Sequence, residues 1–375
     1  MLDLSRQYSA LRTDILAALE RVCASQHFIL GPEVEALERE VAGYCGAADA
    51  VGCASGTDAL WLALLALGVQ PGDTVITTAF SFFASASAIA RIGARPVLLD
   101  VDPHSLNLDP AAVNSFLRPG KPRNLRALLP VHLYGQCADM DALARLAEEY
   151  ELPILEDAAQ AIGAAWRGQR AGTLGSVAAF SFYPTKNLSA YGDAGLVTTI
   201  DPALAAHMRR LRNHGSPRRY LHDEIGWNSR LDAMQAAILR VKLPHIESWN
   251  EQRRARAATY DRLFTQSGLT SATADAAVRI LTTSPHAHHV YHQYVIRAQR
   301  RDALREFLAA RSIGSEIYYP LPLHLQPAFA YLGYREGDLP ESERAAKEVL
   351  ALPMFPELTE AEQQWVVESV AEFYS

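Results

Sequence analysis

Short apolar segments alternate with helix-forming segments over most of the first 240 residues. The apolar segments are continuous runs of small and aliphatic residues, without the polar alternation of a half-exposed strand. Runs of this kind are typical of strands that helices cover on both faces, as in a parallel sheet. We expect strands over residues 50–54, 74–78, 96–99, 127–132, 153–155, 177–182 and 195–200. The pattern predicts an α/β fold with a mostly parallel sheet, whose binding groups lie just beyond the carboxyl ends of its strands.

The character of the chain changes near Trp249, where long charged helices and a more polar region begin. We therefore divide the chain into an N-terminal segment with a large domain, residues 1–248, and a smaller C-terminal α+β domain, residues 249–375. In the second domain we expect an exposed edge strand over residues 289–297. Closing helices are expected over residues 341–350 and 360–373.

The amino-acid composition limits which partners and which cellular compartment we expect. The 375 residues include 35 Lys and Arg against 42 Asp and Glu, a formal charge of −7, with no basic block that would suit a nucleic acid or a membrane surface. The four cysteines lack CxxC or metal-ligand spacing, which is typical of free thiols in a reducing cytoplasm. The first residues do not resemble a signal peptide, and no apolar run is long enough to span a bilayer. We expect a cytoplasmic protein.

Two clusters of basic residues could bind a ligand or could have a structural role only. A histidine group near residue 290 lacks carboxylate or cysteine support, so we expect no metal site there. An arginine-rich group near residue 212 suits either a phosphorylated small molecule or a helix surface, and for each single arginine the surface is favoured. The members are His286, His288, His289 and His292 in the first group, and Arg209, Arg210, Arg212, His214, Arg218 and Arg219 in the second.

The segment SFYPTKNLSAYGDAG, residues 181–195, places one lysine among apolar, aromatic and small residues. Partial burial of Lys186 with few anionic neighbours would lower the pKa of its ammonium group. Such an amine can attack a carbonyl and form a Schiff base. An ordinary loop lysine at a strand end fits this stretch equally well, so other residues must decide.

The segment Ser-Gly-Thr, residues 55–57, follows an expected strand and opens an expected helix. Ser55 suits an N-cap, because Asp58 follows three residues later. A helix start directs free backbone N–H groups to one point, and two hydroxyls join them here, which suits a phosphate. Gly56 would let the backbone approach such a ligand closely. An ordinary capped helix is the alternative.

Asp157, in LEDAAQAIGA, lies at the end of another expected strand. Its carboxylate could face a ring nitrogen, or it could cap a helix. A lysine, a carboxylate and a phosphate cradle are together the parts that pyridoxal phosphate requires. The lysine would hold the aldehyde and move the proton, the carboxylate would keep the pyridine nitrogen protonated, and the cradle would anchor the phosphate.

With these parts in this order, the chain resembles the DegT/DnrJ/EryC1/StrS family of pyridoxal-phosphate-dependent nucleotide-sugar aminotransferases, which have the aspartate-aminotransferase-like fold type I. The resemblance covers nearly the whole chain. It rests on the segments FILGPEVEALEREVAGYCGA, SGTDAL, PVHLYGQCADMD, LEDAAQAIGA, SFYPTKN, GWNSRLDAMQAA and YYPLPLHLQPAF.

The resemblance implies a role for each matching residue. Lys186 would be the Schiff-base lysine, Asp157 the partner of the ring nitrogen and Gln160 the partner of the phenolic oxygen of the cofactor. Phosphate would be bound by Gly56, Thr57 and Ser181, and Phe82 would lie over the pyridine face. Asn228 would reach the phosphate of a neighbouring subunit, which implies a homodimer with shared active sites. Tyr183, Tyr319 and His324 are the candidates for substrate binding, because they would project from the lysine loop and the small domain.

The segment NLSAYGDAG after the lysine is similar to the branch of this family that acts on C3 of nucleotide-linked 3-keto-6-deoxyhexoses. The implied reaction moves an amino group from L-glutamate to C3 of a dTDP-linked 3-keto-6-deoxyhexose, giving a dTDP-3-amino-3,6-dideoxyhexose. Transfer to C4 of a UDP- or dTDP-linked 4-keto sugar is one alternative, and a regulatory protein without catalysis is another. Dehydrating relatives carry histidine in place of the lysine, so Lys186 argues against them.

Overall fold

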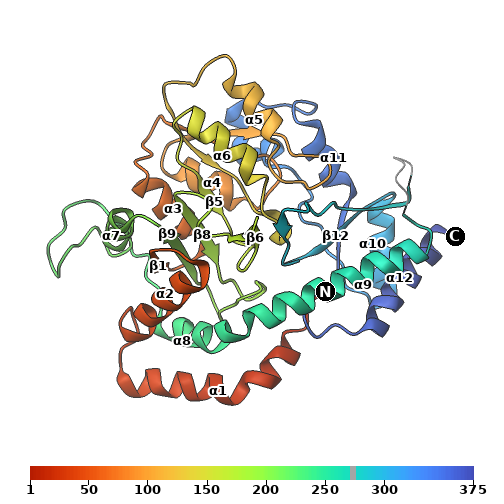
Figure 1. Ribbon diagram of the computed structural model, residues 1–375, viewed down its shortest axis with the longest axis horizontal. Coiled ribbons are helices and arrows are strands. Elements are labelled where there is room, and N and C mark those ends of the chain that lie inside the picture. Colours follow the sequence, from red (N-terminus) through yellow and green to blue (C-terminus); the bar gives the residue numbers. More distant parts are fainter. Residues whose placement is uncertain (271–275) are drawn as a thin grey trace.

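The computed structural model describes residues 1–270 and 276–375 (Figure 1). Seven strands of this described part form one sheet in the order β1-β9-β8-β5-β4-β2-β3, in which isolated bridges from Leu128 to Ile154 and from Val131 to Asp157 join β4 to β5. Six of these strands run parallel, and β9 runs antiparallel to both of its neighbours. The bounds are β1 (Asp49–Cys53), β2 (Thr74–Thr78), β3 (Arg95–Leu99), β4 (Leu125–Leu129), β5 (Leu155–Asp157), β8 (Val177–Ser181) and β9 (Gly195–Thr199). The expected α/β fold with a mostly parallel sheet is confirmed.

Helices cover both faces of this sheet. Alternate residues of β8 point to opposite sides, so that Val177 and Ala179 join one apolar cluster while Ala178 and Phe180 join the other. The first cluster includes residues of α3 (Gly56–Ala66), α4 (Ala84–Arg91) and α7 (Pro202–Leu211). The second includes residues of α2 (Pro32–Cys45), α5 (Pro110–Leu117), α6 (Met140–Glu149) and α8 (Ala233–Lys242). Burial on both faces explains why the strands are continuous apolar runs.

A second, antiparallel sheet lies in the C-terminal part, in the order β10-β12-β13. Figure 1 shows α9 (Ile246–Gln266) running from the large sheet toward the helices of this part. The bounds are β10 (Val278–Ile280), β12 (Tyr294–Ala298), β13 (Val349–Leu352), α10 (Arg301–Ala310), α11 (Pro340–Glu348) and α12 (Glu360–Tyr374). The expected domain boundary at residue 249 falls inside α9, and the division there stays a prediction.

Two expectations for this part are wrong. The strand expected at an exposed edge over residues 289–297 is the central strand β12, and all five of its residues are buried. The helix expected to continue to residue 350 ends at Glu348, because the chain enters β13 there. Both differences follow from the pairing of β12 with β13, two strands that lie far apart in the sequence.

The remaining elements are α1 and several short segments. The long helix α1 (Leu4–Ser25) lies along α8, as Figure 1 shows. The short strands are β6 (Ala165–Trp166), β7 (Gln169–Arg170) and β11 (Ala287–His288), and the 3₁₀ helices are Leu133–Gly135, Leu243–His245, Leu323–Leu325 and Pro327–Leu332. Among the described residues, no helix combines the length and apolar character needed to cross a bilayer.

Candidate active site

A cavity of about 790 Å³ lies at the carboxyl ends of the central strands. Its wall includes nine of the residues that the sequence predicts for the site: Gly56, Thr57, Phe82, Asp157, Gln160, Ser181, Tyr183, Lys186 and Tyr319. These residues come from segments up to 263 positions apart in the chain, the difference between residues 56 and 319. The sheet brings them together because β1, β5 and β8 run parallel and end at the same edge.

One end of the cavity is formed by the start of α3. Ser55 caps this helix, since its hydroxyl accepts a hydrogen bond of 3.1 Å from the backbone N–H of Asp58, as the sequence predicts. The N–H groups of Gly56 and Thr57 belong to the first turn and have no intrahelical acceptor. They lie with the Thr57 side chain at the cavity wall, and this set of donors suits an anion.

Close backbone contacts make two glycines necessary beside this helix start. A Cβ atom at Gly56 would lie 2.5 Å from Cβ of Ser181, at the end of β8. A Cβ atom at Gly195, at the start of β9, would overlap the backbone of Ser55. Gly195 pairs with Ser181 on one side and with Cys53 on the other, so three strand ends converge under the helix start. Because no side chain fits between these strand ends, the space next to Ser181 stays open to the N–H groups at the start of α3.

Lys186 lies on the loop that connects β8 to β9, and its side chain is partly buried in the cavity wall. Burial lowers the pKa of Lys186 to about 8, while the charge of Asp157 opposes this shift. Its Nζ atom has no hydrogen-bond partner within the described chain. The amine of Lys186 therefore loses its proton more readily than that of an ordinary exposed lysine.

Asp157 is the last residue of β5, and its carboxylate is almost fully buried. Oδ2 accepts a hydrogen bond of 2.7 Å from the hydroxyl of Ser85, which in turn lies 2.9 Å from the hydroxyl of Ser81. Oδ1 accepts a bond of 3.2 Å from the backbone N–H of Ala159. Burial raises the pKa of Asp157, and the bond from Ser85 opposes the rise. A buried carboxylate held in this way suits a cationic N–H group in the cavity.

Gln160 has a fixed amide orientation. Its Oε1 accepts a hydrogen bond of 2.6 Å from the backbone N–H of Tyr134, so its Nε2 must point the other way. Nε2 donates to the Tyr319 hydroxyl over 3.1 Å. Burial raises the pKa of Tyr319, which keeps the phenol protonated at neutral pH. The two side chains therefore present hydrogen-bond donors to the cavity.

Two aromatic side chains of the cavity wall are exposed. Phe82 is 57% exposed, and its ring centroid lies 6.1 Å from that of Tyr319. Tyr183 is 52% exposed on the lysine loop. Both rings therefore have an open face toward the space in the cavity, which an aromatic or apolar ligand can cover.

The structure does not bring Asn228 or His324 to this cavity. Asn228 is exposed on the long loop between α7 and α8, which projects from the body of the molecule beside α7 (Figure 1). His324 is 2% exposed, and its Nε2 atom lies 3.0 Å from Oε1 of Glu343. The His324 ring also packs edge-on against Tyr334.

Most of the arginines near residue 212 form ion pairs. Arg209 binds Asp49, with a distance of 2.5 Å between Nη2 and Oδ1, and Arg212 binds the buried Glu38. Arg210 lies 3.3 Å from Glu224. The helix-surface interpretation therefore holds for Arg209 and Arg210, whereas it is wrong for Arg212, whose side chain is buried against Glu38. Arg218 and Arg219 form no ion pair within the described ranges.

Sequence reasoning missed several residues that shape the cavity. Ser85 follows Ser81 by four positions at the start of α4, and this helical spacing beyond a strand was the available signal. Gly195 gave no signal, because its role depends on the pairing of three strands. The residues His292, Gln293, Glu316, Ile317 and Tyr318 also line the cavity, and only the tertiary fold places them there.

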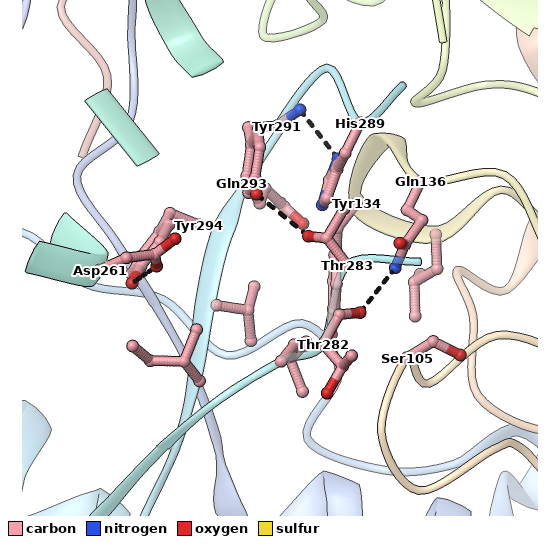
Figure 2. Close-up of a pocket in the computed structure, with 14 residues that line it drawn as sticks. Ser105, Tyr134, Gln136, Asp261, Thr282, Thr283, His289, Tyr291, Gln293 and Tyr294 are labelled. Atoms are coloured by element: carbon pink, nitrogen blue, oxygen red, sulfur yellow. Dashed lines mark hydrogen bonds between the residues drawn. The ribbon is translucent and has the colours of Figure 1, made fainter. Parts of the chain in front are cut away.

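A second, much smaller cavity lies behind the first and shares Gln293 with it. Figure 2 shows its polar wall, in which His289 lies beside Tyr291 and Gln136 bonds to Thr282. Its volume of about 20 Å³ holds about one water molecule and no larger ligand. His289 accepts a hydrogen bond from the backbone N–H of Tyr291, and burial lowers its pKa to about 3. This histidine is therefore a neutral core residue.

The residues of the large cavity fit pyridoxal phosphate. Gly56 and Gly195 keep side chains out of the space where a helix start, Thr57 and Ser181 present hydrogen-bond donors, as a phosphate requires. Lys186 offers an amine of lowered pKa for the aldehyde, and Asp157 offers a buried carboxylate for the ring nitrogen. The residues that meet these demands follow β1, β5 and β8 at the same edge of the sheet.

Comparison with known proteins agrees with this chemistry. A protein of Geobacillus stearothermophilus described as a pleiotropic regulatory protein is 54% identical, over 100% of this chain and 98% of that protein. The dTDP-3-amino-3,4,6-trideoxy-α-D-glucose transaminase of Streptomyces venezuelae is 47% identical, over 99% of this chain and 95% of that enzyme. The crystal structure of DesV from S. venezuelae in complex with a ketimine intermediate superposes with a TM-score of 0.93 at 46% identity, covering 99% of this chain and 97% of DesV.

The DegT/DnrJ/EryC1/StrS aminotransferase family matches residues 9–371, nearly the whole chain. The expected cofactor and enzyme class are thereby confirmed. The protein belongs to the DegT/DnrJ/EryC1/StrS aminotransferase family and is a pyridoxal-phosphate-dependent nucleotide-sugar aminotransferase.

Proposed function

We propose that the enzyme transfers an amino group from L-glutamate to C3 of a dTDP-linked 3-keto-6-deoxyhexose, giving a dTDP-3-amino-3,6-dideoxyhexose. The observation that carries the proposal is the convergence of Lys186, Asp157 and the start of α3 on one cavity of about 790 Å³. A cavity of this size suits a cofactor together with a sugar. The similarity to the S. venezuelae enzyme, whose description names a dTDP sugar aminated at position 3, supports the choice of C3.

Each residue of the site would have a separate task. Bound pyridoxal phosphate supplies an aldehyde that bonds to amines and a ring that withdraws electrons from the neighbouring carbon. Lys186 would hold and move the proton at its Nζ atom, because its lowered pKa leaves the amine able to accept one. Asp157 would keep the ring nitrogen protonated, and Ser85 would keep Asp157 oriented.

Binding would be shared among the other residues of the wall. Gly56, Thr57 and Ser181 would hold the phosphate, Gln160 would donate to the phenolic oxygen, and Phe82 would cover the ring face. Tyr183 and Tyr319 are proposed to contact the sugar. His324 is left out of this set, because its side chain is buried against Glu343.

We propose a homodimer, because the charges in the cavity do not suffice for the substrates. Among the described lining residues, Lys186 is the single lysine or arginine, whereas Asp157, Asp193 and Glu316 carry carboxylates. A nucleotide diphosphate and the carboxylates of glutamate need cations. Arg218, Arg219 and Asn228 lie on the loop between α7 and α8, and none of them lines the cavity of its own chain, so a second copy could supply them. The free cysteines suit the cytoplasm as the compartment of this enzyme.

Absorbance and activity test the reaction. We expect the purified enzyme with pyridoxal phosphate to show a visible absorption band that L-glutamate bleaches, and the Lys186→Ala variant to show neither the band nor turnover. In a panel of dTDP- and UDP-linked 3-keto and 4-keto sugars, the dTDP-linked 3-keto sugar should give the highest kcat/KM. A preference for 4-keto sugars would move the reaction to C4, and turnover by Lys186→Ala would contradict the mechanism.

Complementation tests the dimer. In a shared site, Lys186 comes from one chain and Asn228 from the other. A mixed dimer of a Lys186→Ala chain and an Asn228→Ala chain therefore has one intact site and one site with both defects. Co-expression of the two inactive variants should restore about a quarter of wild-type activity, because half of randomly paired dimers are mixed and each has one good site. No recovery in mixed dimers isolated with two affinity tags would contradict a shared site.

A further inference from the structure

A hydrogen-bonded chain of three buried side chains leads to the neighbourhood of Lys186. Its members are Asn250 on α9, Asn187 next to the lysine, and His292 just before β12. Asn250 and Asn187 are almost completely buried, while His292 is 8% exposed and lines the active-site cavity. The chain therefore runs from the interior to the cavity wall.

Two backbone carbonyls fix the direction of every hydrogen bond in this chain. Asn250 donates from Nδ2 to the carbonyl of Ile162 over 3.0 Å, so its Oδ1 is the acceptor for Asn187. Asn187 donates from Nδ2 to that Oδ1 over 2.8 Å and to the carbonyl of Val290 over 3.2 Å. Its Oδ1 must then accept, and the atom 3.1 Å away is Nδ1 of His292.

The protonation state of His292 follows from this network. Nδ1 carries the proton, and Nε2 keeps a lone pair as an acceptor. Burial, together with the positive charges of Lys186 and Arg253, lowers the pKa of His292 well below its usual value. The ring is therefore neutral at physiological pH, with a basic nitrogen that has no hydrogen-bond partner within the described ranges.

Lys186 is the complementary group. Its Nζ also has no hydrogen-bond partner in the described part of the chain, it lines the same cavity, and its charge acts on the His292 ring. Four rotatable bonds let the amine move within the cavity. A buried ammonium without an acceptor is costly, and a neutral imidazole supplies an acceptor without adding charge.

We propose that His292 is a positioning residue for Lys186. The Nε2 atom of His292 accepts a hydrogen bond from the lysine amine whenever that amine is free. The inference rests on the proposed role of Lys186 as the reactive amine. Asn187 and Asn250 hold the imidazole ring in the orientation and tautomer that this bond requires. The ammonium form gains more from the acceptor than the neutral amine does, so the bond raises the pKa of Lys186 above the value that burial alone would give.

The test measures the amine directly, without substrate or cofactor. Full-length protein freed of cofactor is treated with isotope-labelled acetic anhydride between pH 6 and 10, and mass spectrometry gives the acetylation rate of Lys186 at each pH. The exposed Lys347 in the same sample is the internal reference. Because only the neutral amine reacts, the profile gives the pKa of Lys186.

Three variants of His292 distinguish the effect of losing the Nε2 acceptor from the effect of a damaged fold. His292→Asn keeps a donor for Asn187 and lacks the Nε2 acceptor, whereas His292→Leu lacks both and fills the space. In each we expect the pKa of Lys186 to fall by about one unit, with about tenfold faster acetylation at pH 7. His292→Gln places an amide near the position of Nε2 and should restore most of the shift. His289→Gln, in a neighbouring histidine outside this cavity, should leave the pKa of Lys186 unchanged.

Thermal unfolding shows which variants are folded, and His292→Leu carries the test where His292→Asn fails to fold. An unchanged pKa of Lys186 in a folded variant without the acceptor would overturn the proposal. The outcome does not depend on the amino-group transfer. A shifted lysine pKa in a protein that transfers no amine would refute the proposed function and leave this inference standing.

Discussion

Ser85 donates a hydrogen bond to Oδ2 of Asp157 over 2.7 Å, and both side chains are buried. Hydrogen bonds to a charged group stabilise the ionised form, so this bond holds the pKa of Asp157 below the value that burial alone would give. The serine therefore supports the carboxylate that is proposed to face the ring nitrogen.

Replacing Ser85 with alanine should raise the pKa of Asp157 and weaken catalysis. We expect kcat/KM to fall about tenfold at pH 7, the effect of about 1.4 kcal/mol. With a raised pKa the carboxylate stays protonated to higher pH, so the acidic limb of the pH–rate profile should move toward neutrality. The control is Ser87→Ala, on the same helix but without a bond to Asp157. An unmoved acidic limb would show that Ser85 does not support the carboxylate.

Replacing Gly56 with alanine should damage the phosphate site. The new Cβ atom would lie 2.5 Å from Cβ of Ser181, so the start of α3 and the end of β8 must separate. We expect the free energy of unfolding to fall by about 1–3 kcal/mol and the affinity for pyridoxal phosphate to fall about tenfold or more. Urea denaturation and cofactor titration measure the two effects.

The matched control for Gly56 is Gly43→Ala. Gly43 lies within α2, and a Cβ atom there would meet nothing within 4 Å. Alanine at this position should stabilise the protein by about 0.5–1 kcal/mol and leave the cofactor affinity unchanged. Equal effects of the two substitutions would contradict the close contact at Gly56.

Replacing Arg212 with methionine should strongly destabilise the fold. Arg212 binds the carboxylate of Glu38 and the carbonyl of Gly52, and both charged side chains are buried. Loss of the guanidinium leaves the buried Glu38 carboxylate with only the longer contact of 3.4 Å to Arg209 among the described cations, which we expect to cost about 3 kcal/mol in urea denaturation. Adding Glu38→Gln removes that charge but keeps an acceptor for the Gly52 N–H group, so the double variant should recover at least half of the loss. The exposed pair of Arg344 with Glu341 provides the control, because Arg344→Met should change the free energy by less than about 1 kcal/mol.

The buried His289 should make stability depend on pH. Its pKa is lowered to about 3 in the folded protein, chiefly by burial, whereas the unfolded value is near 6.5. Between these values the unfolded chain binds the additional proton, so stability falls as the pH falls below about 6.5. At pH 5 this one group should cost about 2 kcal/mol relative to pH 7. Urea denaturation at both pH values should show a smaller difference for His289→Gln, and an equal difference would contradict the assignment.

Much of the large sheet could be predicted, because its strands are buried on both faces and separated by capped helices. The site residues at strand ends could be predicted for the same reason, since Asp157 and the segment at residues 55–57 each follow an apolar run. The antiparallel direction of β9 could not be predicted. The alternation of apolar and polar residues carries no information on strand direction, which depends on how the connecting loop returns.

The C-terminal sheet was harder to predict from the sequence, because polar residues there are buried in pairs. Arg297 gives β12 the polar alternation of an edge strand, yet its guanidinium is buried and bonds to Glu348 over 2.6 Å and to the carbonyl of Pro103 over 2.9 Å. His324 is of a residue type that is common in active sites, but it is buried against Glu343, which lies nineteen positions further along the chain. Partners at such distances leave no trace in a local pattern.

The reversed strand β9 determines how the reactive lysine is held. A parallel connection would have to carry the chain back across the sheet to its opposite edge. Because β9 is antiparallel to β8, the chain instead leaves the ligand edge at Ser181 and re-enters it at Gly195, directly beside the residue from which it departed. Lys186 thus lies on a loop whose two ends, Ser181 and Gly195, are both fixed at the proposed phosphate site. The length of this one loop therefore sets how far the Lys186 amine can lie from the proposed phosphate site. Inserting or deleting a single residue in the loop would move the amine relative to that site and leave the sheet intact.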